Sequence, residues 1–485
     1  MEHAGYIDGK LIVGAGQRFE VENPSDESIV DTVVGLSVGQ VEQAVTAARR
    51  SFDDGRWRGL PATERARILR RFGEAMAART DRYRTLAVLE AGCPVSSSVM
   101  MAQVDAPIRQ TFEIIDLFLS LPEFEDNPLP MHERVTARGV LQSRKRWSPL
   151  GVVTAIGAYN VPLFTAHWKV LPALIAGNSV IVRPNPLTPL SSMLYAEAAE
   201  EAGLPPGVLN VVVEDGLDGA RLLTTDPRVD MVSFTGSCTV GAKVAEQSAP
   251  TLKRVVLELG GKSANIFLPD ALDRAPMQAL TVCTSHAGQG CAIGSRIFVP
   301  EDKKAEVLEQ MAELYRKVKI GPASDPATQT GPVISAAQRA RCEHFTKAAV
   351  EHGGRVVCGG KRPEHLAKGY YWEPTVLDLP DNDNPAAQDE IFGPVLSVIG
   401  YRDLDHAVEM ANASKFGLSG YVNGRDAAAA LKVALAIRSG TVNVNAGAMS
   451  SYASTGGIKM SGLGRERGVE GLREFQMFST LNVGA

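Results

Sequence analysis

The chain has 485 residues, of which 45% are hydrophobic and 22% are charged, and its formal net charge at pH 7 is -5. This balance is ordinary for a globular protein of two to four domains, at about 100–200 residues each, and it argues against general binding to nucleic acid or anionic membrane. No run of about 18 apolar residues and no leader peptide are visible, so we expect no nucleic-acid or membrane partner and a cytoplasmic location.

Short strands and turns open the chain, and helices follow them. A helix is predicted from about Val38, because apolar residues recur at helical spacing after it and because Ser37 and Gln40 match the capping-box pattern. Residues 62–119 contain few prolines and many Ala, Leu, Arg and Glu, so they are predicted to be mostly helical. The segment 121–131 is rich in proline and acidic residues, which indicates an excursion from the packed body.

A β-hairpin is predicted after this excursion. Apolar and polar side chains alternate in residues 134–137 and again in 140–143, and Arg138 and Gly139 stand between the two runs as a turn signal.

From Gly151 onward the pattern alternates between buried strands and helices. Strands are predicted at 152–156, 178–182, 209–213, 229–234 and 255–257, with helices such as 190–202 between them. This alternation predicts a doubly wound parallel sheet, whose ligands bind beyond the carboxyl ends of the strands. The second half repeats the theme and so predicts a second α/β domain, with strands at 264–268, 295–299 and 420–422 and helices at 303–317 and 427–437.

Three residues are candidates for chemistry. Cys291 lies in AGQGCAIGSR, where small neighbours leave a thiol open to a ligand, while Glu258 begins ELGGK and Asn160 lies in YNVPL. Taken singly, each has a plain structural interpretation: a small buried cysteine, the surface end of a strand and a turn residue before proline. Together, a thiol and a carboxylate in glycine-rich settings suggest covalent catalysis followed by base-assisted hydrolysis.

Several glycine-rich segments invite another interpretation. Residues 236–243, GSCTVGAK, resemble a phosphate loop, but the lysine stands one position late and Val244 replaces the hydroxyl that would bind magnesium. The segment still follows a strand and opens a helix, whose free N–H groups suit a phosphate, although tight packing alone would also explain it. The glycines at 288–290 and 462–464 lack the full dinucleotide fingerprint.

Seven ordered segments resemble motifs of the aldehyde dehydrogenase superfamily over nearly the whole chain. They are YNVPL at 159–163, WK at 168–169, FTGS at 234–237, ELGGK at 258–262, GQGC at 288–291, DEIFGPV at 389–395 and GGIKMSGLGRE at 456–466. The resemblance implies oxidation of an aldehyde to a carboxylic acid with NAD or NADP as cofactor. It also implies an α/β fold of two doubly wound Rossmann-like domains with a small β-hairpin oligomerisation element.

The resemblance also implies the roles of the site residues. Cys291 would attack the aldehyde as a thiolate, and Asn160 with the Cys291 N–H would stabilise the oxyanion. Glu258 would deprotonate the hydrolytic water, and Lys169 would assist proton relay. The implied cofactor residues are Ile156, Ala158, Tyr159, Arg183, Pro184, Asn185, Gly216, Phe234, Gly236, Ser237, Val240, Leu259, Gly260, Glu390 and Phe392. The implied substrate-pocket residues are Val161, Phe164, Thr165, Trp168, Gly290, Ala292 and Thr455, with the segment 449–455.

Three positions depart from the family pattern. Arg183 stands where lysine is usual, and Pro186 stands where a glutamate often binds the adenosine ribose. Loss of that carboxylate removes a charge that would repel a 2′-phosphate, and Arg183 could pair with such a phosphate, so use of NADP is a hypothesis beside use of NAD. His286 stands where asparagine is common, and the sequence offers no account of it.

The implied pocket residues are small or apolar, apart from hydroxyls and Tyr452. No arginine stands among them to hold a distal carboxylate, and no aromatic cage for a quaternary ammonium is evident. We therefore predict a neutral, apolar aldehyde, aliphatic or aromatic.

Other interpretations of the cysteine stay open at this point. A CoA-acylating aldehyde dehydrogenase would pass the acyl group to CoA, although Glu258 favours water as the acceptor. A cysteine hydrolase or acyltransferase without nicotinamide would need a histidine base, and only His286 is near Cys291 in the sequence. Cys283, His286 and Cys291 could be taken for a metal cluster, but no fourth ligand is obvious, so no metal is predicted.

Family architecture implies the domain limits. Residues 1–122 and 147–257 would form the cofactor-binding domain, and 258–440 the catalytic domain. Residues 123–146 and 468–485 would form the oligomerisation element, while 441–467 would return to the cofactor and active-site region. Two strands with an exposed edge are unstable alone, so we expect a homodimer or homotetramer.

Overall fold

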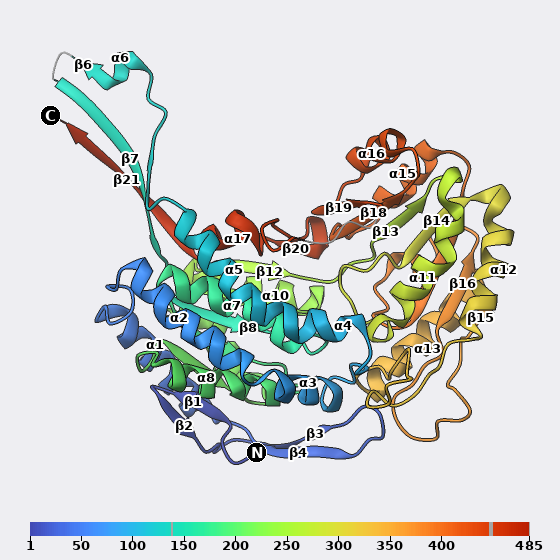
Figure 1. Cartoon of the computed structure of the whole chain (residues 1–485), viewed down its shortest axis with the longest axis horizontal. Coiled ribbons are helices and arrows are strands. Elements are labelled where there is room, and N and C mark those ends of the chain that lie inside the picture. Colours follow the sequence, from blue (N-terminus) through green and yellow to red (C-terminus); the bar gives the residue numbers. More distant parts are fainter. Residues whose placement is uncertain (137–138, 446–449, 485) are drawn as a thin grey trace.

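The structure is a computed structural model that describes residues 1–136, 139–445 and 450–484. Two open α/β sheets lie side by side, and a long arm projects from the body (Figure 1). A separate two-stranded sheet, β3 (Arg18–Glu22) with β4 (Ile29–Val34), lies at the edge of the body near the N-terminus.

The sheet of the first domain has eight strands, and its centre is parallel. Its order is β2 (Lys10–Ile12), β1 (Gly5–Ile7), β10 (Leu209–Val212), β9 (Ser179–Arg183), β8 (Val152–Ile156), β11 (Met231–Thr235), β12 (Arg254–Glu258) and β20 (Gly462–Leu463). The strands from β10 to β12 are parallel, whereas β1, β2 and β20 are antiparallel at the two edges. Every residue of β8, β9 and β11 is buried, as a sheet covered on both faces requires.

Helices cover both faces of this sheet. On one face lie α1 (Val38–Asp53), α9 (Asp218–Thr225) and α10 (Cys238–Ser248), and on the other lie α7 (Pro162–Ala176) and α8 (Leu194–Ala202). The remaining helices before the arm are α2 (Ala62–Ala77), α3 (Thr80–Leu89), α4 (Ser98–Met100) and α5 (Ala106–Ser120), of which α2 and α5 pack against α7. None of the helices in the described part of the chain is long and apolar enough to cross a bilayer.

The second domain has a seven-stranded sheet of the same kind. Its order is β15 (Arg355–Cys358), β16 (Thr375–Leu379), β17 (Val395–Tyr401), β14 (Arg296–Pro300), β13 (Ala264–Phe267), β18 (Ser419–Asn423) and β19 (Thr441–Val444). All are parallel except β15 at one edge. One face is covered by α11 (Ala275–Thr284) and α12 (Lys304–Tyr315), and the other by α13 (Ala336–Glu351), α14 (Pro385–Gln388), α15 (Leu404–Asn412) and α16 (Ala427–Ala436).

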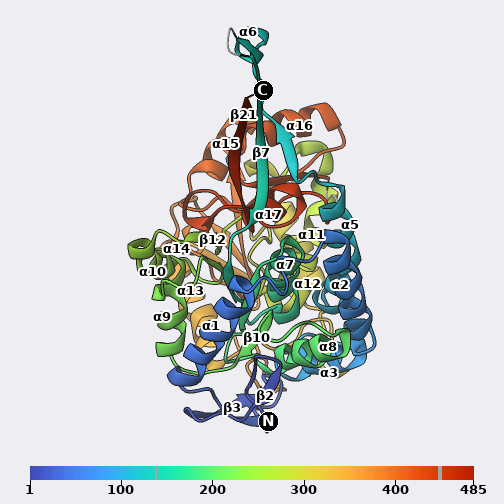
Figure 2. The same ribbon diagram turned by 90° about the vertical axis from the view of Figure 1, so that its left-hand side faces the viewer.

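The arm consists of strands from two distant parts of the chain. It contains β5 (Phe124–Asp126), α6 (Met131–Arg134), β6 (Val135–Thr136), β7 (Gly139–Pro149) and β21 (Gln476–Gly484). β7 pairs antiparallel with β21 along nearly its whole length, and α17 (Gly468–Glu474) connects β21 to the body. Figure 1 shows the arm standing clear of both domains, and Figure 2 views the molecule from the side of the arm, with α6 above the body.

Most of the predicted elements are present. The helix from Val38 and its capping box between Ser37 and Gln40 are confirmed, as are the five strand runs of the first domain and the second α/β domain. β6 and β7 form the predicted hairpin, with Val135 opposite Val140, while Ala137 of the first predicted run and Arg138 of the predicted turn lie outside the described residues. The predicted domain limits stay predictions.

Candidate active site

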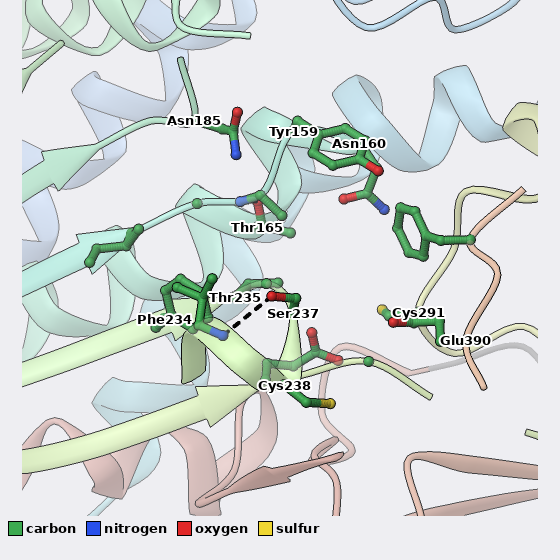
Figure 3. Close-up of a pocket in the computed structure, with 18 of the residues that line it drawn as sticks. Tyr159, Asn160, Thr165, Asn185, Phe234, Thr235, Ser237, Cys238, Cys291 and Glu390 are labelled. Carbon is green, nitrogen blue, oxygen red and sulfur yellow. Dashed lines mark hydrogen bonds between the residues drawn. The ribbon is translucent and has the colours of Figure 1, made fainter. Parts of the chain in front are cut away.

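A cavity of about 940 Å³ lies between the two domains. Its wall includes the carboxyl ends of β8, β9, β11 and β12 from the first sheet, together with loops of the second domain. This is where a doubly wound sheet binds its ligand, and the volume lies near the upper end of the range for small-molecule sites, about 300–1,000 Å³. Figure 3 shows the labelled Asn160, Cys291 and Glu390 lying on the same pocket.

The loop that carries Cys291 has an unusual backbone. His286, Ala287 and Gly288 have φ values of 47°, 50° and 67° in succession, in the left-handed region. For the two residues with side chains this conformation is costly, at about 1–3 kcal/mol each, and it persists only where the surroundings hold it. A Cβ on Gly288 would lie 2.3 Å from the Gly393 carbonyl oxygen, so close packing holds the loop and requires glycine there.

Asn160 is tied to the same loop. Its side-chain amide donates a hydrogen bond to the Gln289 carbonyl at 2.9 Å, and Gln289 Oε1 accepts one from the Ile334 N–H at 2.9 Å. Because a primary amide has two N–H donors, the Asn160 amide retains one for a ligand oxygen in the cavity.

Glu258 ends β12, and its carboxylate lies close enough to the Cys291 thiol for each group to shift the pKa of the other. Burial raises the pKa of Glu258 to about 8; the nearby Glu466 charge adds to the rise and Lys169 partly offsets it. Burial, followed by the charges of Glu258 and Glu390, raises the pKa of the Cys291 thiol well above its usual range. The thiol therefore keeps its proton in this state, next to a carboxylate placed to accept it.

Lys169 lies behind the cavity wall rather than on it. Its side chain is fully buried within α7, and its ammonium forms an ion pair with the carboxylate of Glu466, which does line the cavity. The pair places a cation close enough to Glu258 to lower its pKa. Glu466 is the last residue of the motif at 456–466, to which no role was assigned from the sequence. The motif was the sequence signal that could have identified it.

Glu390 is positioned by backbone contacts from the glutamate motif. Its Oε1 accepts a hydrogen bond from the Gly261 N–H at 3.0 Å, and a Cβ on Gly260 would lie 2.1 Å from its Oε2, so only glycine permits this approach. Burial raises the pKa of Glu390 to about 7 despite the Gly261 hydrogen bond. Beside it, Phe392 makes an edge contact with Tyr159, with ring centroids 5.8 Å apart.

The wall at the opposite end of the cavity contains backbone N–H groups and one ion pair. Ser237 is the N-cap of α10 and its hydroxyl accepts a hydrogen bond from the Val240 N–H at 3.3 Å. The first turn of α10 lines the cavity, and its N–H groups without helical partners suit a phosphate. Arg183 Nε donates to Glu214 Oε1 at 2.8 Å and its Nη2 donates to the Gly216 carbonyl at 2.8 Å, with both charged side chains buried.

Most of the predicted site residues line this cavity. The exceptions are Lys169, Pro184, Leu259 and Gly290, together with residues 450–454 of the predicted pocket segment. Six charged residues that were not predicted line it as well: Asp215, Arg341, Asp389, Lys415, Glu466 and Arg467. No arginine stands among the predicted pocket residues, but Arg467, which was not predicted, contacts two of them, Phe164 and Trp168. Residue 449 of the predicted pocket segment lies outside the described residues.

His286 does not take the place of a catalytic base. It is buried, neither ring nitrogen has a hydrogen-bond partner within the described ranges, and it does not line the cavity. Burial lowers the pKa of His286 to about 4, so its ring is neutral. This geometry weakens the cysteine-hydrolase alternative.

Known proteins resemble the chain over nearly its full length. Residues 12–481 match the model of the aldehyde dehydrogenase family. Betaine aldehyde dehydrogenase of Bacillus subtilis is 33% identical, with 98% of this chain and 96% of that protein aligned. 3-Succinoylsemialdehyde-pyridine dehydrogenase of a Pseudomonas species is 36% identical, covering 97% of this chain and 96% of that protein.

A solved structure gives the same result. A variant of aldehyde dehydrogenase C from Pseudomonas syringae, in complex with NAD+ and octanal, superposes with a TM-score of 0.92 at 34% identity and covers 99% of this chain and 96% of that one. The family model matched over residues 12–481, the identity to the relatives and the similarity in fold lead to one conclusion: this chain belongs to the aldehyde dehydrogenase family.

Proposed function

We propose that the protein oxidises an aldehyde to a carboxylic acid through a thioester at Cys291, with NAD+ as its preferred cofactor. The single observation that carries this proposal is the convergence of Cys291, Glu258 and Asn160 on one cavity, in a chain of the aldehyde dehydrogenase family. The predicted cytoplasmic location remains a prediction.

The first step is attack of the Cys291 sulfur on the aldehyde carbon. Glu258, which lies beside the thiol, accepts its proton, and this gives the thiolate that burial otherwise disfavours. The free N–H of the Asn160 amide, held by Gln289, and the Cys291 backbone N–H stabilise the oxyanion that forms. A bound nicotinamide would supply the hydride acceptor, and loss of hydride from the carbon would leave a thioester on Cys291.

Hydrolysis of the thioester needs a base, and Glu258 is placed for it. Its pKa of about 8 matches a group that must hold and release a proton near neutral pH. The Lys169–Glu466 pair lies next to this carboxylate and offers an onward route for its proton. Water, rather than CoA, is the proposed acyl acceptor for this reason.

The cavity also fits the dinucleotide. The first turn of α10 supplies N–H groups for the pyrophosphate, and Glu390, fixed by Gly261, supplies a carboxylate for the nicotinamide ribose. NAD+ is favoured over NADP+ because Arg183, the arginine expected to meet a 2′-phosphate, already donates to Glu214 and to the Gly216 carbonyl. Glu214 would also repel an added phosphate.

A steady-state assay with both cofactors and a panel of aldehydes tests the proposal. Formation of reduced nicotinamide is expected with a higher kcat/KM for NAD+ than for NADP+. A preference for NADP+ would overturn the cofactor choice, and formation of acyl-CoA in the presence of CoA would favour the acylating alternative. If the only activity found were hydrolysis of an ester without nicotinamide, the result would favour the cysteine hydrolase.

The body of the substrate contacts an apolar wall in this proposal. Val161, Phe164 and Trp168 line the cavity, which supports the predicted aliphatic or aromatic aldehyde. A panel that places straight-chain and aromatic aldehydes above short polar ones in kcat/KM is the expected result.

The arm is the proposed oligomerisation element. Apolar side chains of β21 are exposed on it, including Phe478 at 54% and Leu481 at 41%. Such a surface is stable when a second copy covers it, so a homodimer or homotetramer is expected. Leu481→Asp should lower the molar mass measured by light scattering, whereas Leu252→Asp, at a residue 91% exposed on the body, should not. Equal masses for the two variants would contradict the assignment.

A further inference from the structure

Arg467 is a buried cation on the cavity wall. Its side chain belongs to the residue that precedes α17, it is 5% exposed, and it lines the cavity. Its Nε is buried without a hydrogen-bond partner, and within the described ranges its guanidinium makes no hydrogen bond and no ion pair. Buried guanidinium groups are ordinarily satisfied, so this one has donors left for a ligand.

Two aromatic rings hold the guanidinium in place. Its Cζ lies 4.6 Å from the ring centroid of Trp168 and 5.6 Å from that of Phe164. Phe164 and Trp168 are four residues apart on α7, so they lie on one face of that helix, in the turns that follow Asn160. The arrangement fixes the planar fork and leaves its edge for recognition of another planar group.

The neighbouring carboxylates do not neutralise Arg467 by direct contact. Glu466 is paired with Lys169, and Glu113 pairs with Arg109 at 3.2 Å and accepts a hydrogen bond from the Ser451 hydroxyl. Arg467 also has a φ of 66°, a conformation that a residue with a side chain rarely adopts and that is often found at functional sites.

We propose that Arg467 binds a carboxylate at the far end of the substrate, so that the enzyme prefers aldehydes whose apolar body ends in a carboxylate. This inference rests on the proposed aldehyde oxidation. Asn160 and Cys291 hold the reacting carbonyl at one end of α7, while Phe164 and Trp168 flank the apolar body and present Arg467 beyond it. Guanidinium and carboxylate match as a two-pronged, charge-assisted pair.

The same geometry disfavours a quaternary ammonium substrate. The faces of Trp168 and Phe164 that could attract such a cation are occupied by Arg467, which carries the same charge. Betaine aldehyde, the substrate in the name of one relative, should therefore be a poor substrate of this chain.

A matched pair of substrates tests the proposal. 4-Carboxybenzaldehyde and its methyl ester share the ring and the aldehyde but differ in the distal charge. The enzyme should show a kcat/KM at least about 10-fold higher for the acid, within the range expected of a charge-assisted pair. Arg467→Met should abolish this preference, and Arg467→Lys should retain part of it. Arg109→Met removes a charge from the same neighbourhood at a residue 69% exposed and should leave the ratio within about threefold.

The outcomes separate the two proposals. Equal kcat/KM for acid and ester, or an equal loss for both in Arg467→Met, would overturn the carboxylate site and leave aldehyde oxidation standing. No reduction of NAD+ or NADP+ with either aldehyde would instead overturn the proposed function. Methionine and lysine bear the same φ strain as arginine, and thermal unfolding of each variant shows whether a loss reflects the fold.

Discussion

The two walls of the cavity carry charge in different ways. The wall proposed to bind the cofactor, called the cofactor wall and formed by Arg183, Gly236 and Ser237, has an arginine neutralised by Glu214 and backbone groups at the start of α10. The reactive wall, formed by Cys291 and Glu258, carries titratable groups whose pKa values are raised, chiefly by burial. Recognition on the first wall is spread over many small contacts, whereas chemistry on the second depends on single groups. Substitutions should therefore act weakly on one wall and strongly on the other.

The largest effect is expected at Cys291. Cys291→Ala removes the proposed nucleophile of the reactive wall, so kcat/KM for any aldehyde should fall by about 10⁴-fold or more. Cys358→Ala, at a partly exposed cysteine that does not line the cavity, should match the wild type. Retention of more than about 1% activity without Cys291 would break the contrast between the walls.

Glu258→Gln should come next, with a loss in kcat of about 10²–10⁴-fold, because the amide cannot accept a proton. Wild-type kcat should rise with pH and level off above about 8, since the carboxylate is the active form and burial raises its pKa to about 8. The pH profile of the variant should be flat in this range. A profile that keeps the same rise in Glu258→Gln would assign the titration to another group.

Glu466→Gln should reduce stability more than any change on the cofactor wall. It would leave the fully buried Lys169 without a counter-charge, and breaking such a pair costs about 3–5 kcal/mol. Denaturant unfolding measures the change in the free energy of unfolding. Glu343→Gln, which breaks the exposed pair with Lys347, should leave the midpoint unchanged, and equal shifts for both variants would contradict the role of burial.

The smallest effect is expected at Ser237 on the cofactor wall. Ser237→Ala removes the cap of α10 and should destabilise the protein by about 0.5–2 kcal/mol. The KM for NAD+ should rise only a few-fold, because the backbone N–H groups remain. A loss of kcat as large as that of Glu258→Gln would show that the two walls do not differ as proposed.

The sequence predicted the central strands and α1 because their signals are local. Five buried runs and a capping box each lie within a few consecutive residues. β20 was not predicted, since a strand of two residues has no periodicity to detect. The partners of buried charges could not be predicted either. Arg183 meets Glu214 because β9 and β10 lie side by side, and Arg467 meets Trp168 only after the chain returns to the first domain.

The surroundings of Arg467 could not be predicted from the sequence. This residue follows GGIKMSGLGRE directly, yet the motif says nothing of the two rings that hold it or of the donors it leaves free. Its omission left the predicted pocket without an arginine, whereas Arg467 lines the cavity.

The arm has a consequence for biosynthesis. β7 precedes most strands of both α/β sheets in the chain, whereas its partner β21 follows all of them. Translation at roughly 5–20 residues per second leaves the edge of β7 without this partner for tens of seconds. During that interval an 11-residue strand with an open edge is available to nascent copies on the same messenger. In the proposed oligomer, assembly of subunits would wait for synthesis of β21, and slow, dilute expression should improve the yield of correctly paired protein.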